Sequence, residues 1–257
     1  MKREEGWNNL FWQIIQAREK FFQEGWAANV FCEGKISLSA LHTPSKYLLI
    51  SYGSLRAVEA LAKYSLRQKW ELYGISGPED MVNFLLDCRG EKGRKSWGYT
   101  PRVFKLFQTT NLSKKARFKD YKLAPVSNID WPKARIWAQK FAMEADPPMN
   151  LSAITQLAKQ MHSEKNLFML SDPQNHPCAM AGFGRSTDRY RVINMVYVPQ
   201  DMRRQGIGKE LITRMALYAK ELRYSACLLF SERKEAGNLY DTMGCKALGK
   251  FVEYGLV

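Results

Sequence analysis

The stretch that decides the fold is residues 191–220, RVINMVYVPQ DMRRQGIGKE LITRMALYAK. Its first part is rich in β-branched apolar residues up to Pro199, and this pattern predicts a buried strand. A short loop with Gly206 and Gly208 follows, and apolar residues then recur at helical spacing over residues 212–222. We therefore expect a strand, a loop and a helix, with one face of the helix in the core.

The glycine loop is a candidate anion site. Glycine at 206 and 208 removes side chains where the backbone turns into the helix, so successive N–H groups can face one open space. The first amides of a helix lack acceptors within the helix, and the helix dipole adds positive potential there. Such a loop suits a pyrophosphate. An ordinary glycine-rich turn is the alternative, because a short G-x-G motif alone has many false positives.

Two motifs, in the right order, resemble the GNAT acyltransferase superfamily. The loop reads Arg203-x-x-Gly206-x-Gly208 after a strand that ends Val-Tyr-Val-Pro, and it is similar to the R/Q-x-x-G-x-G/A loop that holds the pyrophosphate of acyl-CoA in that family. Residues 236–245, AGNLYDTMGC, resemble the family's A-x-x-L-Y-x-x-x-G-F helix. The loop has neither the spacing of a Rossmann fingerprint nor the Gly-Lys-Ser/Thr of a Walker loop.

The resemblance implies an acyl-CoA-dependent N-acetyltransferase and gives roles to individual residues. The backbone of Val196, Tyr197 and Val198 would pair with the pantetheine arm like an added strand, and one of these amides would serve as the oxyanion donor. Tyr240 would protonate the leaving thiolate, because an ordinary tyrosine keeps its proton at neutral pH; packing in the core is its alternative role. The residues implied for acetyl-CoA at the loop are Arg203, Arg204, Gln205, Gly206, Ile207, Gly208 and Lys209.

A general base is not evident in residues 191–196, where many family members carry a glutamate. Glu144 or Glu232 could act through a water molecule, and Asn194 could orient that water. The amine could also arrive already neutral. Surface carboxylates are usually only solvated, so these options stay open.

The whole chain is expected to have an α/β (α+β) fold with two GNAT-like halves, each a mixed, mostly antiparallel sheet flanked by helices. Residues 1–122 would form a degenerate N-terminal half and residues 123–257 the acetyltransferase domain, as in tandem GNAT proteins. A strand and a helix at 70–88 distantly resemble the decisive stretch, but they lack the R-x-x-G-x-G spacing, and Pro78 has no N–H to offer a phosphate. We therefore expect one acyl-CoA per chain, bound by the second half.

Charge and composition limit the possible partners. The chain has 257 residues and a formal net charge of +14, and between residues 89 and 122 eleven basic side chains stand against two acidic ones. We interpret this basic stretch as a solvated linker, so nucleic acid is an unlikely partner, whereas the positive charge suits an anionic acyl-CoA. Neither a signal peptide nor an apolar run of membrane-spanning length is evident, so a cytoplasmic protein that does not bind a membrane is expected.

The five cysteines and three histidines are scattered, without a C-x-x-C or H-E-x-x-H pattern. Reduced thiols are expected, and a metal site is not. The predicted function is transfer of an acetyl group from acetyl-CoA to a primary amine of a small molecule or peptide, by direct attack on the thioester. A non-catalytic acyl-CoA-binding regulatory module is the alternative. The sequence leaves the acceptor amine and the oligomeric state open.

Overall fold

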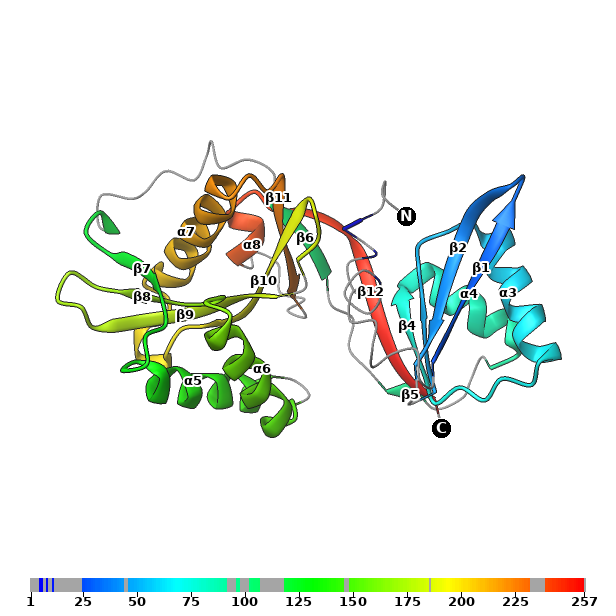
Figure 1. Ribbon diagram of the computed structural model, residues 1–257, viewed down its shortest axis with the longest axis horizontal. Helices are drawn as coiled ribbons and strands as arrows, with labels where there is room; N and C mark the ends of the chain where they lie inside the picture. Colours follow the sequence, from blue (N-terminus) through cyan, green and yellow to red (C-terminus); the bar gives the residue numbers. More distant parts are fainter. Residues whose placement is uncertain are drawn as a thin grey trace. The chain divides into compact units, whose positions relative to one another are not determined.

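The computed structural model of the chain describes residues 5, 6, 8, 11, 25–43, 46–91, 96, 97, 102–106, 118–145, 148–184, 186–231 and 239–256. By its contacts the chain divides into two compact units, residues 1–103, 230–233 and 247–257 in the first, and residues 104–229 and 234–246 in the second. Each unit has its own sheet and helices, which confirms the predicted fold class (Figure 1). The predicted domain boundary after residue 122 stays a prediction, because a compact unit need not be a domain that folds alone.

The sheet of the first unit is mixed and has the strand order β1-β2-β3-β4-β12 (Figure 1). Its strands are β1 (Trp26–Cys32), β2 (Lys35–His42), β3 (Tyr47–Ile50), β4 (Gly74–Pro78), β12 (Lys246–Leu256) and the short β5 (Ser96–Trp97), which pairs with β12. The pairs β1/β2, β2/β3 and β4/β12 are antiparallel, whereas β3 and β4 are parallel. Val252 of β12 lies opposite Gly77 and is fully buried. A strand from the C-terminal part of the chain therefore completes a sheet whose other long strands all lie before residue 79.

Two helices pack against each other and cover one face of this sheet (Figure 1). They are α3 (Leu55–Arg67) and α4 (Glu79–Arg89). Their apolar positions, which include Val58, Leu61 and Leu85, are buried against the strands. β4 begins at Gly74, four residues after the start predicted from the sequence, and α4 follows it directly.

The sheet of the second unit has the strand order β11-β10-β9-β8-β7 (Figure 1). Its strands are β7 (Lys122–Pro125), β8 (Leu167–Ser171), β9 (Pro177–Gly184), β10 (Tyr190–Tyr197) and β11 (Ala226–Ser231). Neighbours are antiparallel except β10 and β11, which are parallel. The strand β6 (Arg102–Leu106) contains the boundary between the units at residues 103 and 104.

Helices cover both faces of the second sheet (Figure 1). They are α5 (Trp131–Met143) and α6 (Leu151–Ser163) on one face, and α7 (Ile207–Glu221) with α8 (Leu239–Thr242) on the other. Alternation along β8 builds the two cores, because Phe168 and Leu170 face α7 while Leu167 and Met169 face α5 and α6. The predicted strand, loop and helix of the decisive stretch are confirmed as β10, a loop that includes η4 (Gln200–Met202), and α7.

The two units share one order of elements. In each, two antiparallel strands lead to a third, which a helix connects to a parallel neighbour: β3, α3 and β4 in the first unit, and β10, α7 and β11 in the second. The counterpart of the loop before α7 is therefore residues 51–54, and not the stretch at 70–88 that the sequence indicated. In that counterpart the hydroxyl of Ser54 accepts a hydrogen bond from Ala57 N–H and so caps its own helix.

Within the described residues, no helix is long and apolar enough to cross a membrane. The same residues contain no group of three or more His, Cys, Asp or Glu side chains placed to hold a metal ion. Much of the basic stretch at 89–122 lies outside the described part of the chain, and so does Glu232.

Candidate functional site

β10 carries a bulge at the point where it leaves β11. The parallel pairing of the two strands ends at Ile193, although β10 continues to Tyr197. After Asn194 the register of β10 with β9 shifts, and Met195 has a left-handed φ of 53°. A bulge bends its strand and increases the local twist. Beyond Ile193, β10 therefore bends away from the direction in which it pairs with β11.

The side chain of Asn194 holds this bulge. Its Oδ1 accepts a hydrogen bond from the N–H of Met195 at 2.7 Å. Asparagine is disfavoured in a strand, but it is common where a side chain must satisfy a nearby backbone amide. The role expected from the sequence, orienting a water for a general base, would therefore fall to Nδ2.

The glycine loop leads into α7 without a side-chain cap. Arg204 and Gly206 have left-handed φ values of 60° and 85°, and Gly206 is the residue directly before the helix. A Cβ added at Gly206 would contact only the ring of Phe118 among the described residues, at 3.6 Å or more. Uncapped N–H groups at a helix start are the donors that bind anions, so the loop fits the pyrophosphate that the resemblance implies.

Gly208 has a different role, which is close packing. A Cβ at this position would lie 3.4 Å from Leu239 of α8 and 3.5 Å from Val198, which follows β10. The first turn of α7 therefore fits between these two side chains. Lys209 strengthens the same junction, because its Nζ donates a hydrogen bond to the carbonyl oxygen of Thr242 at 3.1 Å.

Positive charge dominates around the loop. Arg204 and Lys209 lie in or next to it, and so does Arg203, which is paired with Glu144. The buried carboxylate of Glu210 is paired with Nε of Arg214 at 2.6 Å. That ion pair compensates the acid in the first turn of α7. The charges of Arg204 and Lys209 and the helix dipole favour an anionic ligand.

Tyr240 lies in α8 and packs, partly buried, against the core on the α7 side of the sheet. Its carbonyl oxygen accepts hydrogen bonds from the N–H groups of Met243 and Cys245, both at 3.1 Å. These bonds end the helix and fix the backbone at Tyr240. The assignment of its phenol as a proton donor stays a prediction.

Glu144 follows α5 and is held by two residues of the predicted site. Its Oε1 accepts a hydrogen bond from the hydroxyl of Tyr197 at 3.3 Å, and its Oε2 forms an ion pair with Nη2 of Arg203. Burial and the nearby Glu144 charge raise the pKa of Tyr197, which keeps the phenol protonated. Nε of Arg203 in turn donates to the carbonyl oxygen of Val198 at 2.8 Å. The structure thus joins Glu144, a candidate base, to Tyr197 and Arg203, two of the residues predicted to bind acetyl-CoA.

Sequence reasoning missed several residues that shape this region. Phe118 lies against Gly206, and Leu239 against Gly208, yet no local pattern in the sequence links either pair. The role of Asn194 did carry a signal, because a polar, poor strand former stands inside an apolar β-branched run. A bulge could have been predicted from that feature.

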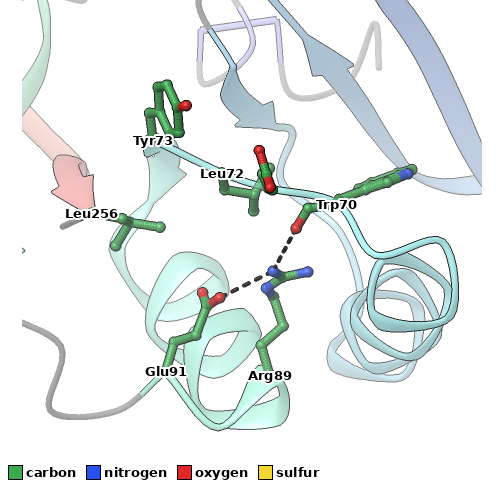
Figure 2. A pocket seen from close by; sticks show the side chains of 7 residues that line it. Trp70, Leu72, Tyr73, Arg89, Glu91 and Leu256 are labelled. Atoms are coloured by element: carbon green, nitrogen blue, oxygen red, sulfur yellow. Dashed lines mark hydrogen bonds and ion pairs between the residues drawn. The ribbon is translucent and has the colours of Figure 1, made fainter.

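A pocket of about 450 Å³ lies in the first unit, and none of the residues that line it belongs to the predicted site (Figure 2). Nη2 of Arg89 donates to the carbonyl oxygen of Trp70 at 3.1 Å and to Glu91 at 3.0 Å, as Figure 2 shows. Only 4% of the Arg89 side chain and 8% of the Glu91 side chain are exposed. These two charges therefore compensate each other within the wall of the pocket. The pocket is lined by Trp70, Glu71, Leu72, Tyr73, Arg89, Glu91 and Leu256.

The second unit is an α/β domain in which a parallel strand pair separates after a bulge, next to a glycine loop that opens the connecting helix. Comparison with known protein families gives a match for part of the chain. Residues 145–255 match the family described as acetyltransferase (GNAT) domain, which confirms the resemblance of this part of the chain to that family. No curated protein matches the sequence.

Solved structures of GNAT proteins resemble nearly the whole chain. An acetyltransferase of the GNAT family from Colwellia psychrerythraea has a TM-score of 0.60 and 13% identity, covering 96% of this chain and 97% of that one. A GCN5-related N-acetyltransferase from Sphaerobacter thermophilus has a TM-score of 0.62 and 13% identity, and the match covers 94% of this chain and 84% of that one. A tandem GNAT protein from the clavulanic acid biosynthesis pathway has a TM-score of 0.53 and 9% identity, and the match covers 90% of this chain and 82% of that one. At these identities the likeness shows the fold alone.

Proposed function

We propose that this protein transfers an acetyl group from acetyl-CoA to a primary amine of a small molecule or peptide. The observation that carries the proposal is the separation of β10 from β11 after Ile193, directly before the uncapped start of α7. An extended pantetheine arm can pair with the edge of β10 near Val196, Tyr197 and Val198. The amides of residues 204–209 would then bind the pyrophosphate.

The chemistry that we assign to these residues has two parts. As the amine nitrogen attacks the thioester carbon, a backbone N–H near Tyr197 would stabilise the negative charge on the carbonyl oxygen. When the carbon–sulfur bond breaks, Tyr240 would donate its proton to the sulfur and regain one from solvent. Glu144 is already paired with Arg203, and β10 contains no acidic residue, so the proton of the amine would pass to solvent.

For the first unit we propose a degenerate GNAT-like half that binds no acyl-CoA. Its order of elements repeats that of the second unit, which supports a common plan. The start of α3 is capped by Ser54, so the amide that an anion would need is already bonded. A Cβ at Gly53 would come within 2.4 Å of the carbonyl oxygen of Ser37, which shows how tightly this loop packs.

One observation favours the alternative, a non-catalytic acyl-CoA-binding module. The carboxylate of Glu144 is engaged by Tyr197 and Arg203, and β10 supplies no other carboxylate that could serve as a base. A protein with this arrangement can bind acyl-CoA through the loop without activating an amine.

A panel of acceptor amines distinguishes the two functions. Purified protein is mixed with acetyl-CoA and each amine, thiol release is measured, and acetyl-CoA affinity is determined in parallel by calorimetry. Turnover with any amine supports the enzyme, and binding without turnover across the panel supports the module. Absence of acetyl-CoA binding contradicts both functions. The matched control is Gly206→Asp, which places a carboxylate in the proposed pyrophosphate space.

A further inference from the structure

We propose that Arg203 is a positioning residue, which fixes the glycine loop through Val198 and Glu144 and does not itself hold the pyrophosphate. The inference rests on the proposed function, because it assigns the loop to acyl-CoA. It concerns how the first residue of the R-x-x-G-x-G motif acts in this chain. The alternative is that Arg203 contacts the phosphates directly as a cation.

The first observation is that the side chain of Arg203 folds back onto its own loop. Its Nε donates to the carbonyl oxygen of Val198 at 2.8 Å, and its backbone N–H donates to the carbonyl oxygen of Gln200 at 3.3 Å. One residue therefore closes the turn that contains η4 by two hydrogen bonds. The residue after this turn is Arg204, where the left-handed part of the loop begins.

The second observation is that the other side of the guanidinium is occupied by Glu144. Nη2 forms the ion pair with Oε2, while the hydroxyl of Tyr197 donates to Oε1 at 3.3 Å. The guanidinium also lies over the ring of Tyr197, 5.7 Å from its centroid. The N–H of Glu144 donates to the carbonyl oxygen of Lys140, so the carboxylate projects from the ordered end of α5. Helix, strand and loop thus meet at Arg203.

Charge points to the same conclusion. Glu144 compensates the positive charge of Arg203, and both side chains are about one third exposed, at 32% and 35%. An ion pair of this exposure contributes little to overall stability, so its main effect is on local geometry. The next residue, Arg204, is exposed, and the described residues offer it no ion-pair partner within 4.0 Å. Arg204 therefore has the uncompensated charge that a phosphate contact needs.

The neighbouring arginines provide a matched pair of variants, Arg203→Gln and Arg204→Gln. Acetyl-CoA affinity is measured by calorimetry at about 50 mM and about 300 mM salt, because salt screens direct charge contacts. We expect Arg204→Gln to weaken binding and to reduce its salt dependence. We expect Arg203→Gln to weaken binding about tenfold, because the loss corresponds to about one hydrogen bond to a charged group. The salt dependence of binding by this variant should equal that of the wild type.

Glu144→Gln separates the two roles by the sign of its effect. If Arg203 positions the loop, loss of the ion pair weakens acetyl-CoA binding, and Arg203→Gln combined with Glu144→Gln costs little more than Arg203→Gln alone. If Arg203 binds phosphate directly, its release from Glu144 tightens binding. Tighter binding by Glu144→Gln, or a reduced salt dependence in Arg203→Gln, overturns the proposal.

Hydrogen exchange of the ligand-free protein provides a test that does not depend on acetyl-CoA. We expect faster exchange of the amides of residues 204–209 in Arg203→Gln and Glu144→Gln, and wild-type exchange in Arg204→Gln. Thermal unfolding confirms that each variant is folded. If the wild type fails to bind acetyl-CoA, the proposed function fails while this measurement still decides the role of Arg203. Unchanged exchange in Arg203→Gln overturns the positioning role.

Discussion

The N–H of Met195 is bonded by Oδ1 of Asn194, its immediate neighbour, at 2.7 Å. Met195 has a φ of 53°, a conformation that costs a residue with a side chain about 1–2 kcal/mol. A hydrogen bond of this kind contributes about 1 kcal/mol net. Asn194 therefore offsets much of the strain at the position where β10 leaves β11.

Replacing Asn194 with alanine should weaken acetyl-CoA binding about fivefold and lower the free energy of unfolding by about 1 kcal/mol, because the bulge loses its hydrogen bond. The control is Asn166→Ala, which removes a side-chain acceptor for Nη2 of Arg191 at 2.9 Å. It should lower stability by a similar amount and leave acetyl-CoA affinity unchanged. Calorimetry and chemical denaturation measure both quantities, and equal affinity losses would contradict a specific role for the bulge.

Gly206→Asp should abolish measurable acetyl-CoA binding, because a carboxylate would stand where the pyrophosphate is expected. The matched control is Gly90→Asp, since Gly90 after α4 also has a left-handed φ, 70° against 85° at Gly206, and a Cβ there would have no atom of the described residues within 4 Å. Both variants should lose about 1 kcal/mol of stability. Only Gly206→Asp should lose acetyl-CoA binding. Intact binding in that variant would show that the loop is an ordinary turn and not the pyrophosphate site.

Tyr240→Phe should lower kcat by about 10²-fold or more while acetyl-CoA affinity stays near that of the wild type, because a general acid acts mainly in the transition state. The control is Tyr218→Phe, a tyrosine of α7 that packs against the same core. Steady-state thiol release with an accepted amine measures the effect. If kcat is unchanged under conditions where chemistry limits the rate, Tyr240 is not the proton donor and serves only in packing.

The unfolding free energy should fall as the pH rises from 9 to 12. Burial raises the pKa of Cys227 from 9.0 to about 12, so below pH 9 the thiol is protonated in both states. Above pH 9 the unfolded chain loses this proton more readily than the folded one, which removes up to about 1.4 kcal/mol per pH unit. The stability difference between the wild type and Cys227→Ala should therefore narrow over this range in denaturant titrations, and a constant difference would contradict the assignment.

One acyl-CoA should bind per chain. The loop at residues 51–54 is the counterpart of the loop before α7, and Ser54 already occupies the Ala57 amide there. Titration of the full chain should give a stoichiometry near one, and Gly206→Asp should remove all of it. Residual binding in that variant would reveal a second site.

Local pattern was enough to predict β10, its loop and α7, because these elements depend on neighbouring residues. The sequence motif predicted a loop at Gly206 and Gly208, and the structure has left-handed backbone at Gly206 and close packing at Gly208. Contacts between distant segments could not be predicted. The pairing of Glu144 with Arg203 spans 59 positions, and no periodicity in the sequence encodes it.

The same limit explains the mistaken counterpart at 70–88. A strand followed by a helix resembles another strand followed by a helix, but only the parallel pairing of β3 with β4 shows which connection matters. That pairing depends on the sheet as a whole. The sequence also gave no indication that β12 would pair with β4.

The place of β12 has a consequence for how the chain is made. A ribosome releases the N-terminal residues first, and domains often fold while synthesis continues. The sheet of the first unit cannot close in that order, because β4 must wait until residues 251–255 have emerged. Until then one edge of β4 lacks its β12 partner and the core position of Val252 is empty, so this sheet exposes a strand edge until the end of the chain has been made.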